Sequence, residues 1–188
     1  MAEHLNKSRI LQTKILGVCA IFIAFFVDAG MPMGDLFRYV GYMMVCFCAM
    51  GRLYTTVFIG GRKNQTLVND GPYSIIRHPL YFFSLMGIVG ISFITENALV
   101  IAVFPICFVV LYYQLMRREE AYLSMKFADA YLDYMQQTPR FVPNFARYKA
   151  PEVITTRPDF VRKAFRDSLA WFIALPLIDA LNLVKAGI

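Results

Sequence analysis

Long apolar runs separated by short polar stretches dominate the pattern of hydrophobic and polar positions along the chain. The runs at 10–27 and 36–59 approach the roughly 20 residues that a helix needs to cross the hydrocarbon core of a membrane. The runs at 81–94 and 98–116 are separated only by a short polar turn, which predicts a helical hairpin in the membrane. We therefore expect an all-α, polytopic membrane protein with about four transmembrane helices, folded as a single domain over residues 1–188.

Three residues refine the predicted spans. The first run ends in Phe-Phe-Val-Asp up to Asp28, where a cleaved signal peptide would need small residues, so a retained first span is the better interpretation. Pro105 predicts a kink in the second arm of the hairpin. Arg52 lies within the second span, where a charge is costly unless it reaches the interface or faces a polar cavity. Arg52 is therefore a candidate site residue, with a snorkelling side chain as the alternative.

The segment at 117–143 has the pattern of a cytoplasmic amphipathic helix that follows the hairpin. One helical face carries a glutamate and then apolar or aromatic residues every three or four positions: Glu120, Leu123, Phe127, Tyr131 and Tyr134. Pro139 to Pro143 should end this helix and form an extended cover segment. The alternative is a helix that lies on the membrane with its aromatic rings in the interface.

Residues 144–188 form a C-terminal extension. Its apolar part, at 168–184, is interrupted by Pro176 and Asp179. An internal aspartate favours a re-entrant, interfacial or partner-packed position, because a carboxylate is costly in lipid. We expect this part not to cross the membrane.

The composition agrees with a membrane protein: 58% of the residues are hydrophobic and 17% are charged, against roughly 45–50% and 25% in soluble domains. The net charge of +6 could indicate nucleic acid, but the basic residues collect in the N-terminal tail, at 62–77 and at 117–166, and are absent from 28–35 and 95–97. The positive-inside rule explains this without nucleic acid and predicts that both termini and the active site are cytoplasmic. The four cysteines lie in apolar runs without metal-ligand spacing, so we expect buried thiols and no metal site.

The candidate chemistry centres on Gly71–Tyr81, a polar, turn-rich stretch with the sequence Gly-Pro-Tyr-Ser-Ile-Ile-Arg-His-Pro-Leu-Tyr. Pro79 suits the first turn of a helix, so Arg77 and His78 should lie at a helix N-terminus, at the edge of the apolar layer. Backbone N–H groups and two side-chain donors there favour an anionic or polar ligand. The alternative is a helix start with a snorkelling arginine and a capping histidine.

The predicted hairpin brings a second polar cluster, which starts at Arg117, to the same side of the membrane as His78. The two clusters together contain carboxylates, cationic donors and aromatic faces: Arg77, His78, Tyr81, Glu119, Glu120, Tyr131 and Arg140. The sequence shows no Ser-His-Asp triad, no metal-binding group, no P-loop and no Rossmann fingerprint. Such a pocket suits a ligand that carries both charges and an aromatic ring, beside an apolar substrate.

These residues resemble a known family. The stretch Gly71–Tyr81 is similar to the Gly-Pro-Tyr…Arg-His-Pro-x-Tyr signature of the isoprenylcysteine carboxyl methyltransferases and related phospholipid methyltransferases. The segment from Glu119 to Tyr134 resembles the family's Glu-Glu…Leu…Phe-Gly-x-x-Tyr…Tyr segment, and Pro139–Pro143 resembles its closing Arg/Pro stretch. Ala128 stands where the family usually has glycine.

The resemblance implies an integral-membrane methyltransferase that uses S-adenosylmethionine and methylates a lipophilic or lipidated acceptor among the membrane lipids. By position it implies that the cofactor is held by Arg77, His78, Tyr81, Glu120, Tyr131 and Arg140. The arginine expected one turn before the glutamates is replaced by Gln114 or Leu115, which leaves Arg52 or Arg117 to orient the acceptor. An isoprenylcysteine-like carboxylate would need no base, whereas a phospholipid amine or a small thiol would need one, such as His78 or Glu119.

Two other classes are consistent with parts of the sequence. A sterol-reductase-like enzyme that uses NADPH has a similar C-terminal hairpin, but it would need many more spans than 188 residues allow. A non-enzymatic membrane scaffold or subunit would use the same motif only to start and end helices.

Overall fold

The computed structural model describes residues 19, 22–23, 26, 35–62 and 65–186. The elements in this part of the chain are α2 (Asp35–Ile59), α3 (Pro72–Ile75), α4 (Pro79–Ile94), α5 (Ala98–Gln137), the short 3₁₀ helix η1 (Phe145–Arg147) and α6 (Pro158–Ala186). Helices α2, α5 and α6 are long and apolar enough to cross a membrane, and α4 is a shorter apolar helix. The prediction of an all-α, polytopic membrane protein is confirmed, whereas the predicted span at 10–27 lies largely outside the described residues.

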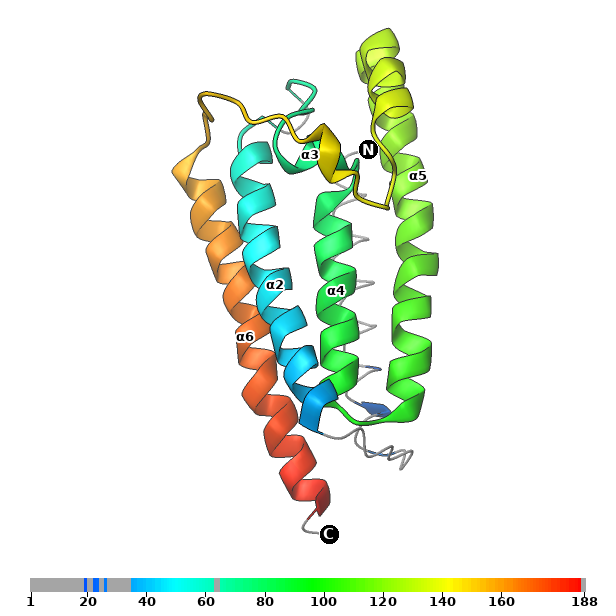
Figure 1. Cartoon of the computed structure of the whole chain (residues 1–188), viewed down its shortest axis with the longest axis vertical. Coiled ribbons are helices and arrows are strands. Elements are labelled where there is room, and N and C mark those ends of the chain that lie inside the picture. Colours follow the sequence, from blue (N-terminus) through cyan, green and yellow to red (C-terminus); the bar gives the residue numbers. More distant parts are fainter. Residues whose placement is uncertain (1–18, 20–21, 24–25, 27–34, 63–64, 187–188) are drawn as a thin grey trace.

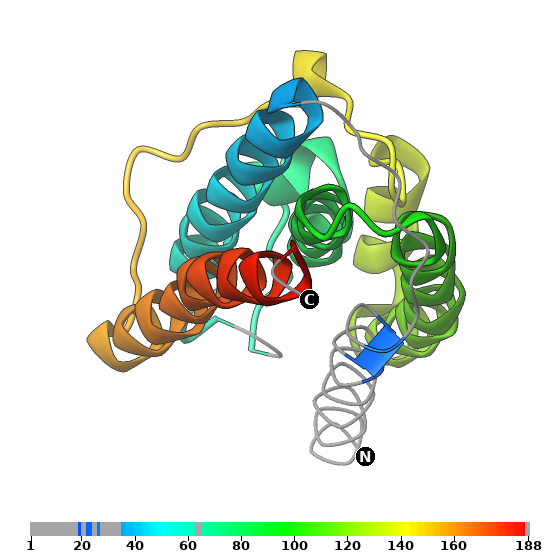
Figure 2. The ribbon, with the colours of Figure 1, turned by 90° about the horizontal axis from the view of Figure 1, so that it is seen from below.

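Helices α2, α4, α5 and α6 run side by side as a bundle, and α3 and η1 lie at one end of it (Figure 1). We name this end the α3 end, and the opposite end, where the turn at 95–97 joins α4 to α5, the turn end. Viewed along the bundle, α4 is central, with α2, α5 and α6 around it (Figure 2). The predicted hairpin is therefore present, and both of its outer ends lie at the α3 end.

Small residues allow α2 and α4 to approach closely. Ser84, Gly87 and Gly90 of α4 are all buried, and a Cβ atom on Gly90 would lie 2.7 Å from the carbonyl oxygen of Gly41 in α2. In lipid, helices associate through such packing rather than through the hydrophobic effect. This contact packs the end of α4 nearest the turn closely against the start of α2.

Helix α5 continues well beyond the predicted second arm of the hairpin, over 40 residues that include a break at Ala128. At its start, the Asn97 side chain accepts hydrogen bonds from the backbone N–H groups of Leu99 and Val100, at 3.1 and 3.2 Å, which caps the helix. The apolar part of α5 ends at Met116, and charged residues begin at Arg117.

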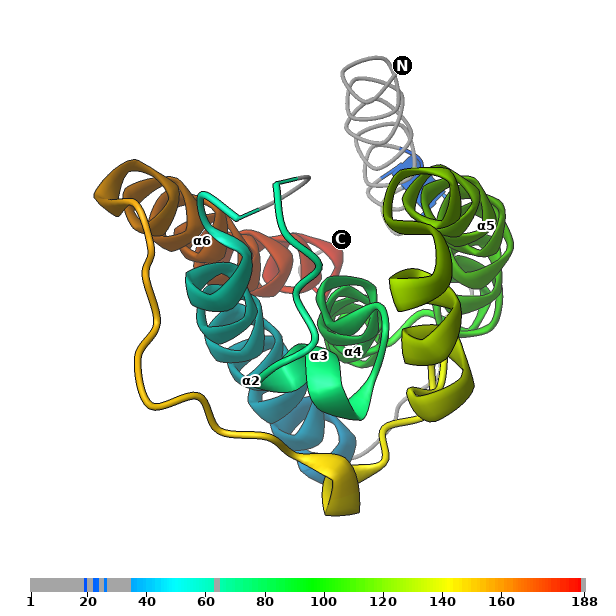
Figure 3. The same cartoon turned by 90° about the horizontal axis from the view of Figure 1, so that it is seen from above.

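Helix α5 continues through Pro105, and its backbone leaves the helical region further on, at Ala128. Ala128 has φ 45° and ψ −125°, and it is the position inside α5 where the backbone leaves the helical region. After this break the last turns of α5 bend away from its axis toward α3 (Figure 3). The bend therefore turns the end of α5 over the α3 end of the bundle.

Helix α6 corrects the prediction for 168–184. It runs through Pro176 without interruption, and it is long and apolar enough to cross a membrane. The carboxylate of Asp179 accepts hydrogen bonds from Arg38 Nη2 at 2.8 Å and from Tyr42 Oη at 2.6 Å. Because a cation compensates this carboxylate, the cost that argued against a crossing helix is removed.

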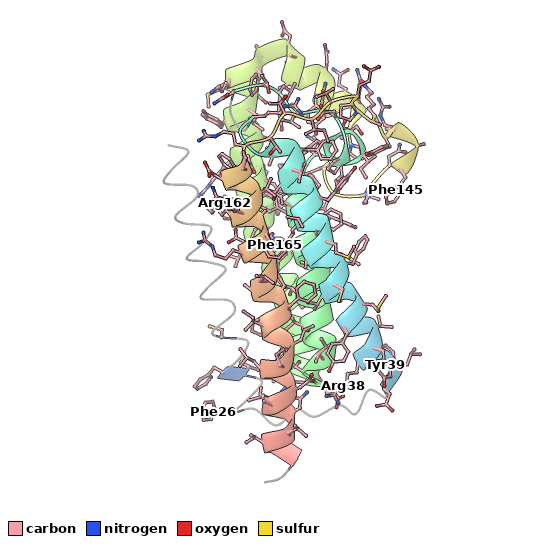
Figure 4. The ribbon with its side chains drawn as sticks, turned by 90° about the vertical axis from the view of Figure 1, so that its left-hand side faces the viewer. Phe26, Arg38, Tyr39, Phe145, Arg162 and Phe165 are labelled. Carbon is pink, nitrogen blue, oxygen red and sulfur yellow. The ribbon has the colours of Figure 1, made fainter. Side chains whose placement is uncertain are left out.

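The end of α6 also corrects the prediction that both termini lie on the side of the site. The Asn182 amide donates to the carbonyl oxygen of Ile94, next to the turn, at 2.8 Å. The C-terminal end of α6 therefore lies at the turn end, opposite α3 (Figure 1). Figure 4 shows the same course: Arg162 lies toward the α3 end of α6, and Arg38, the partner of Asp179, lies toward the turn end of α2. The N-terminal tail lies outside the described residues.

Candidate active site

The site is built where the start of α4 meets the charged part of α5. His78 is the N-cap residue of α4, and Pro79 follows in the first helical turn, as the sequence predicts. The preceding backbone N–H, that of Arg77, donates to the carbonyl oxygen of Pro139 at 2.9 Å, so the cover segment after α5 is attached directly to this turn. The hairpin thus brings together three stretches that are far apart in the sequence.

Glu120 is the centre of the site. Its side chain accepts from His78 Nε2 at 3.0 Å and from Arg140 Nη2 at 2.7 Å, and it pairs with Arg77 Nη1 at 3.0 Å. The residue is only 5% exposed. Because an ionised carboxylate only accepts hydrogen bonds, His78 carries a proton on Nε2 in this arrangement.

Hydrogen bonds and neighbouring cations stabilise the negative charge of the buried Glu120 side chain. Burial alone would raise the pKa of Glu120, but the hydrogen bonds from His78 and Arg140 and the charge of Arg77 lower it from 4.5 to about 2. The hydrogen bond to Glu120 in turn raises the pKa of Arg140. The cluster therefore holds an ionised carboxylate between two permanent cations at neutral pH.

Glu119 lies beside this cluster, and its side chain is more exposed to solvent than that of Glu120. Its Oε2 accepts from the Tyr81 hydroxyl at 2.9 Å and lies 4.0 Å from His78 Nδ1. The Glu119 side chain is 28% exposed, against 7% for Glu120. The rings of His78 and Tyr81 stack, with centroids 5.6 Å apart and planes 19° apart. The imidazole thus lies between two carboxylates, one buried and one that water can reach.

A cavity of about 690 Å³, with the open solvent at its mouth included, lies against these residues. Its lining combines charged groups with aromatic and apolar side chains: Ile59, Thr66, Leu67, Val68, Tyr73, Arg77, His78, Pro79, Leu80, Tyr81, Glu119, Leu123, Phe127, Tyr131 and Tyr134. The amphipathic face predicted for α5 therefore faces this cavity rather than only the membrane interface.

The bent end of α5 closes one side of the cavity. Tyr131 is 1% exposed, and burial raises the pKa of its phenol, which keeps the hydroxyl neutral. Tyr134 donates to the backbone carbonyl of Tyr73 at 2.7 Å and so joins the end of α5 to α3. Tyr73 and the loop at 66–68 were not among the predicted site residues. For Tyr73 a signal was present, since it is the tyrosine of the Gly-Pro-Tyr motif; the loop has no such signal.

Two of the predicted residues lie apart from the Glu120 cluster. Arg52 faces α4 inside the bundle, where its Nη1 donates to the Ser84 hydroxyl. Arg117 is exposed on α5, and in the described part of the chain it forms no ion pair. Among the described residues, no group of three or more histidine, cysteine, aspartate or glutamate side chains is arranged to hold a metal ion.

Comparison with known proteins places this geometry in a family. The family model described as phospholipid methyltransferase matches residues 34–130, just over half of the chain, including the start of α4 and both glutamates. The chain belongs to the phospholipid methyltransferase family. The resemblance inferred from the two motifs is thereby confirmed.

Relatives of this family member come from bacteria and eukaryotes. The cobalt-zinc-cadmium resistance protein CzcN of Cupriavidus metallidurans is 35% identical over 74% of this chain and 63% of its own length. The nickel-cobalt-cadmium resistance protein NccN of Alcaligenes xylosoxydans xylosoxydans is 32% identical over 78% of this chain and 68% of its own length. The protein-S-isoprenylcysteine O-methyltransferase of Schizosaccharomyces pombe is 31% identical over 43% of this chain and 34% of its own length. The chain thus spans less than two thirds of CzcN and about a third of the yeast enzyme.

Proposed function

We propose that this protein transfers a methyl group from S-adenosylmethionine to a lipophilic acceptor, of which an isoprenylcysteine-like carboxylate is the preferred class. The observation that carries the proposal is the buried Glu120, held by His78, Arg77 and Arg140 beside a cavity at the end of the bundle. The family assignment supports the reaction class. The basic residues at the α3 end support a cytoplasmic site.

The residues around the cavity fit the charges and the ring of this cofactor. Arg77 Nε is buried and has no hydrogen-bond partner among the described residues, so it is available to the cofactor's carboxylate. Glu119 adds a partly exposed carboxylate to the cavity wall. The faces of Tyr73, Tyr131 and Phe127 provide aromatic surface for the adenine ring. We assign cofactor binding to the predicted residues, which either contact the cofactor or hold the Glu120 side chain: Arg77, His78, Tyr81, Glu120, Tyr131 and Arg140.

Methyl transfer from S-adenosylmethionine needs little acid–base catalysis by the protein. When bound, S-adenosylmethionine supplies a methyl group already activated by its sulfonium sulfur. The side chains then have to align the acceptor with that group and exclude water. A carboxylate acceptor needs no base, whereas a phospholipid amine would need one. For an amine, Glu119 is the better placed group, because it is partly exposed and Glu120 is fully engaged by its partners.

The direct test is S-adenosylmethionine binding to the full chain in lipid nanodiscs, measured by calorimetry. We expect Glu120→Gln to weaken binding by about tenfold or more, because Arg77, His78 and Arg140 lose their common acceptor. Glu152→Gln is the matched control, since Glu152 is exposed on the segment between η1 and α6. If folded wild-type protein does not bind the cofactor at millimolar concentration, the proposal is wrong.

The acceptor is tested separately, by methyl transfer from radiolabelled cofactor to three compounds. These are an isoprenylcysteine carboxylate, a phosphatidylethanolamine and a small alkyl thiol. We expect the carboxylate to be methylated fastest. Faster methylation of the amine or the thiol would support methyl transfer as the reaction but show that a carboxylate is not the preferred acceptor.

A further inference from the structure

The segment between α5 and α6 exposes apolar side chains at the α3 end of the bundle. Val142, Phe145 and Val153 are 76%, 74% and 80% exposed. Phe145, the first residue of η1, lies at the outer edge of the bundle, on the side of α2 (Figure 4). Large apolar side chains that gather on an exposed surface mark a contact with a partner or with a membrane.

A hydrogen bond shows how deep this segment lies relative to α2. Tyr148, which follows η1, has its hydroxyl 2.6 Å from the hydroxyl of Tyr54. Tyr54 lies five residues before Ile59, the last residue of α2, which is about 7–8 Å along the helix axis. Because α2 is apolar and long enough to cross a membrane, the segment lies beside the outermost turns of a membrane-spanning helix. Both tyrosine side chains are half-exposed, and tyrosine favours the interface between membrane and water.

The start of α6 lies at the same level of the bundle. The Thr156 hydroxyl donates to the carbonyl oxygen of Gly60 at 3.2 Å. Further along, the Ser168 hydroxyl donates to the carbonyl oxygen of Ala49 at 3.1 Å. The first turns of α6 are therefore beside the last turns of α2, and they carry exposed basic residues before the apolar part begins: Arg162, Lys163 and Arg166. Basic side chains at the end of an apolar helix are typical of the headgroup region.

The segment is also basic, and two of its cations have no carboxylate partner. Residues 144–166 contain six basic side chains and two acidic ones, Glu152 and Asp159. In the part of the chain that the structure describes, Arg147 and Lys149 form no ion pair. Positive charge beside exposed apolar side chains complements the anionic lipids of a membrane surface.

We propose that residues 142–149 form an interfacial anchor that binds anionic phospholipids. The side chains of Val142 and Phe145 lie among the lipid headgroups and the first acyl carbons, and Arg147 and Lys149 pair with headgroup phosphates. The partner is the lipid leaflet at the α3 end, because the contact between Tyr148 and α2 holds the segment against the exposed side of a spanning helix. This inference does not depend on the proposed methyl transfer.

The anchor is attached to the cavity through α3. The backbone N–H of Asn144 donates to the carbonyl oxygen of Ile75 at 2.9 Å, and that of Gly71 donates to the carbonyl oxygen of Lys149 at 2.8 Å. Tyr73 lies between these two contacts and lines the cavity. Lipid bound by the anchor would therefore help to hold the wall of the cavity that Tyr73 forms.

The test is quenching of tryptophan fluorescence by lipids that carry bromine on the acyl chain near the headgroup. The full chain with Trp171→Phe is placed in nanodiscs, and Phe145→Trp supplies the single tryptophan. Every nanodisc contains phosphatidylglycerol and phosphatidylcholine in equal amounts, and only one of the two is brominated. The matched control is Met125→Trp, since Met125 is also exposed and lies on α5 about 13 Å beyond Met116.

We expect the Phe145→Trp reporter to be quenched by both lipids, with a severalfold preference for phosphatidylglycerol, because one cation near the surface favours an anionic lipid by about fivefold. Lys149→Gln in this background should reduce the preference by about twofold or more. Lys126→Gln, the same change at an exposed position of α5, should leave it unaltered. The Met125→Trp reporter should be quenched by acrylamide in the water and by neither lipid.

Three outcomes overturn the proposal. If neither lipid quenches the Phe145→Trp reporter while acrylamide does, the segment faces water. If lipids and acrylamide all fail to quench it, a second protein chain covers the segment. If the two brominated lipids quench equally, the segment does not select anionic headgroups. Should Phe145→Trp fail to fold, Val142→Trp takes its place, because Val142 is as exposed in the same segment.

Discussion

Ala128 has a backbone conformation that suits glycine, and replacing it with glycine should stabilise the protein. Its φ of 45° and ψ of −125° lie in a region that residues with a Cβ atom rarely occupy, and holding such a residue there costs about 1–3 kcal/mol. Glycine adopts this conformation readily, but it gains entropy in the unfolded chain, which offsets about 0.5–1 kcal/mol. The Ala128 side chain is exposed, so no packing is lost. The expected net gain in the free energy of unfolding is about 1 kcal/mol.

The assay is thermal unfolding of the full chain in nanodiscs, followed through the fluorescence of the single tryptophan, Trp171. For a chain of this size, 1 kcal/mol shifts the midpoint by about 2–4 °C, so Ala128→Gly should raise it by about that amount. The matched control is Ala121→Gly, because Ala121 is also exposed and lies in the regular part of α5. There glycine should lower the midpoint by about 1–4 °C, since it costs about 0.5–1 kcal/mol inside a helix.

Equal destabilisation by the two substitutions would refute the reasoning, because it would mean that the backbone at Ala128 carries no strain. The same samples test the consequence for the site. The break at Ala128 directs Tyr131 and Tyr134 toward the cavity, so Ala128→Gly should keep the affinity for S-adenosylmethionine. A proline at the same position would fix φ near −65° and should weaken cofactor binding.

Three further predictions concern packing, charge and the C-terminal helix. Gly90→Ala should lower stability by about 1–3 kcal/mol in a thermal scan, because its Cβ would lie 2.7 Å from the Gly41 carbonyl oxygen. The ion pairs of Glu120 should contribute stability fully above about pH 4.5 and lose it as the pH falls toward 2, because the pKa of Glu120 is lowered in the folded state; unfolding midpoints measured across this range test this. Asp179→Asn should increase hydrogen exchange in α6, because Arg38 then loses its partner carboxylate.

Each of these has a control within the chain. Val110→Ala, on the exposed face of α5, should change the thermal midpoint much less than Gly90→Ala. Glu120→Gln should remove the extra acid sensitivity, so an identical pH profile for this variant and wild type would contradict the pKa argument. Asp159→Asn changes an exposed pair with Arg162 and should leave exchange in α6 unaltered. Comparable exchange in the two aspartate variants would show that the Arg38 pair does not fasten α6.

The sequence was sufficient to predict that His78 and Glu120 meet, because the prediction needed only the hairpin and a count of crossings. Two apolar runs joined by three polar residues return the chain to its starting side, whatever the details of packing. The periodicity of Leu123, Phe127 and Tyr131 likewise specified which face of α5 lines the cavity. The assignment of partners within the site was not predictable: Glu120, rather than Glu119, takes His78 Nε2, and Arg140 shares that carboxylate.

The wrong prediction for α6 has a specific physical cause. Asp179 was read as an obstacle to crossing because its partner is not visible in the local sequence. That partner, Arg38, lies in another helix and reaches Asp179 only after α2 and α6 pack together. The local sequence shows that a charge lies in an apolar segment, but it does not show which distant residue pairs with that charge. The long-range ion pair therefore removes the argument against a crossing helix. The non-helical backbone at Ala128 did have a signal in the sequence, because the family usually carries glycine at this position and glycine suits a positive φ.

The ion pairs inside the bundle lie at two separate levels. In the part of the chain that the structure describes, Glu120 pairs with Arg77 and Arg140 at the α3 end, and Asp179 of α6 pairs with Arg38 of α2 toward the turn end. Arg52 lies between these two levels, where it contacts the Ser84 hydroxyl and the ring of Trp171.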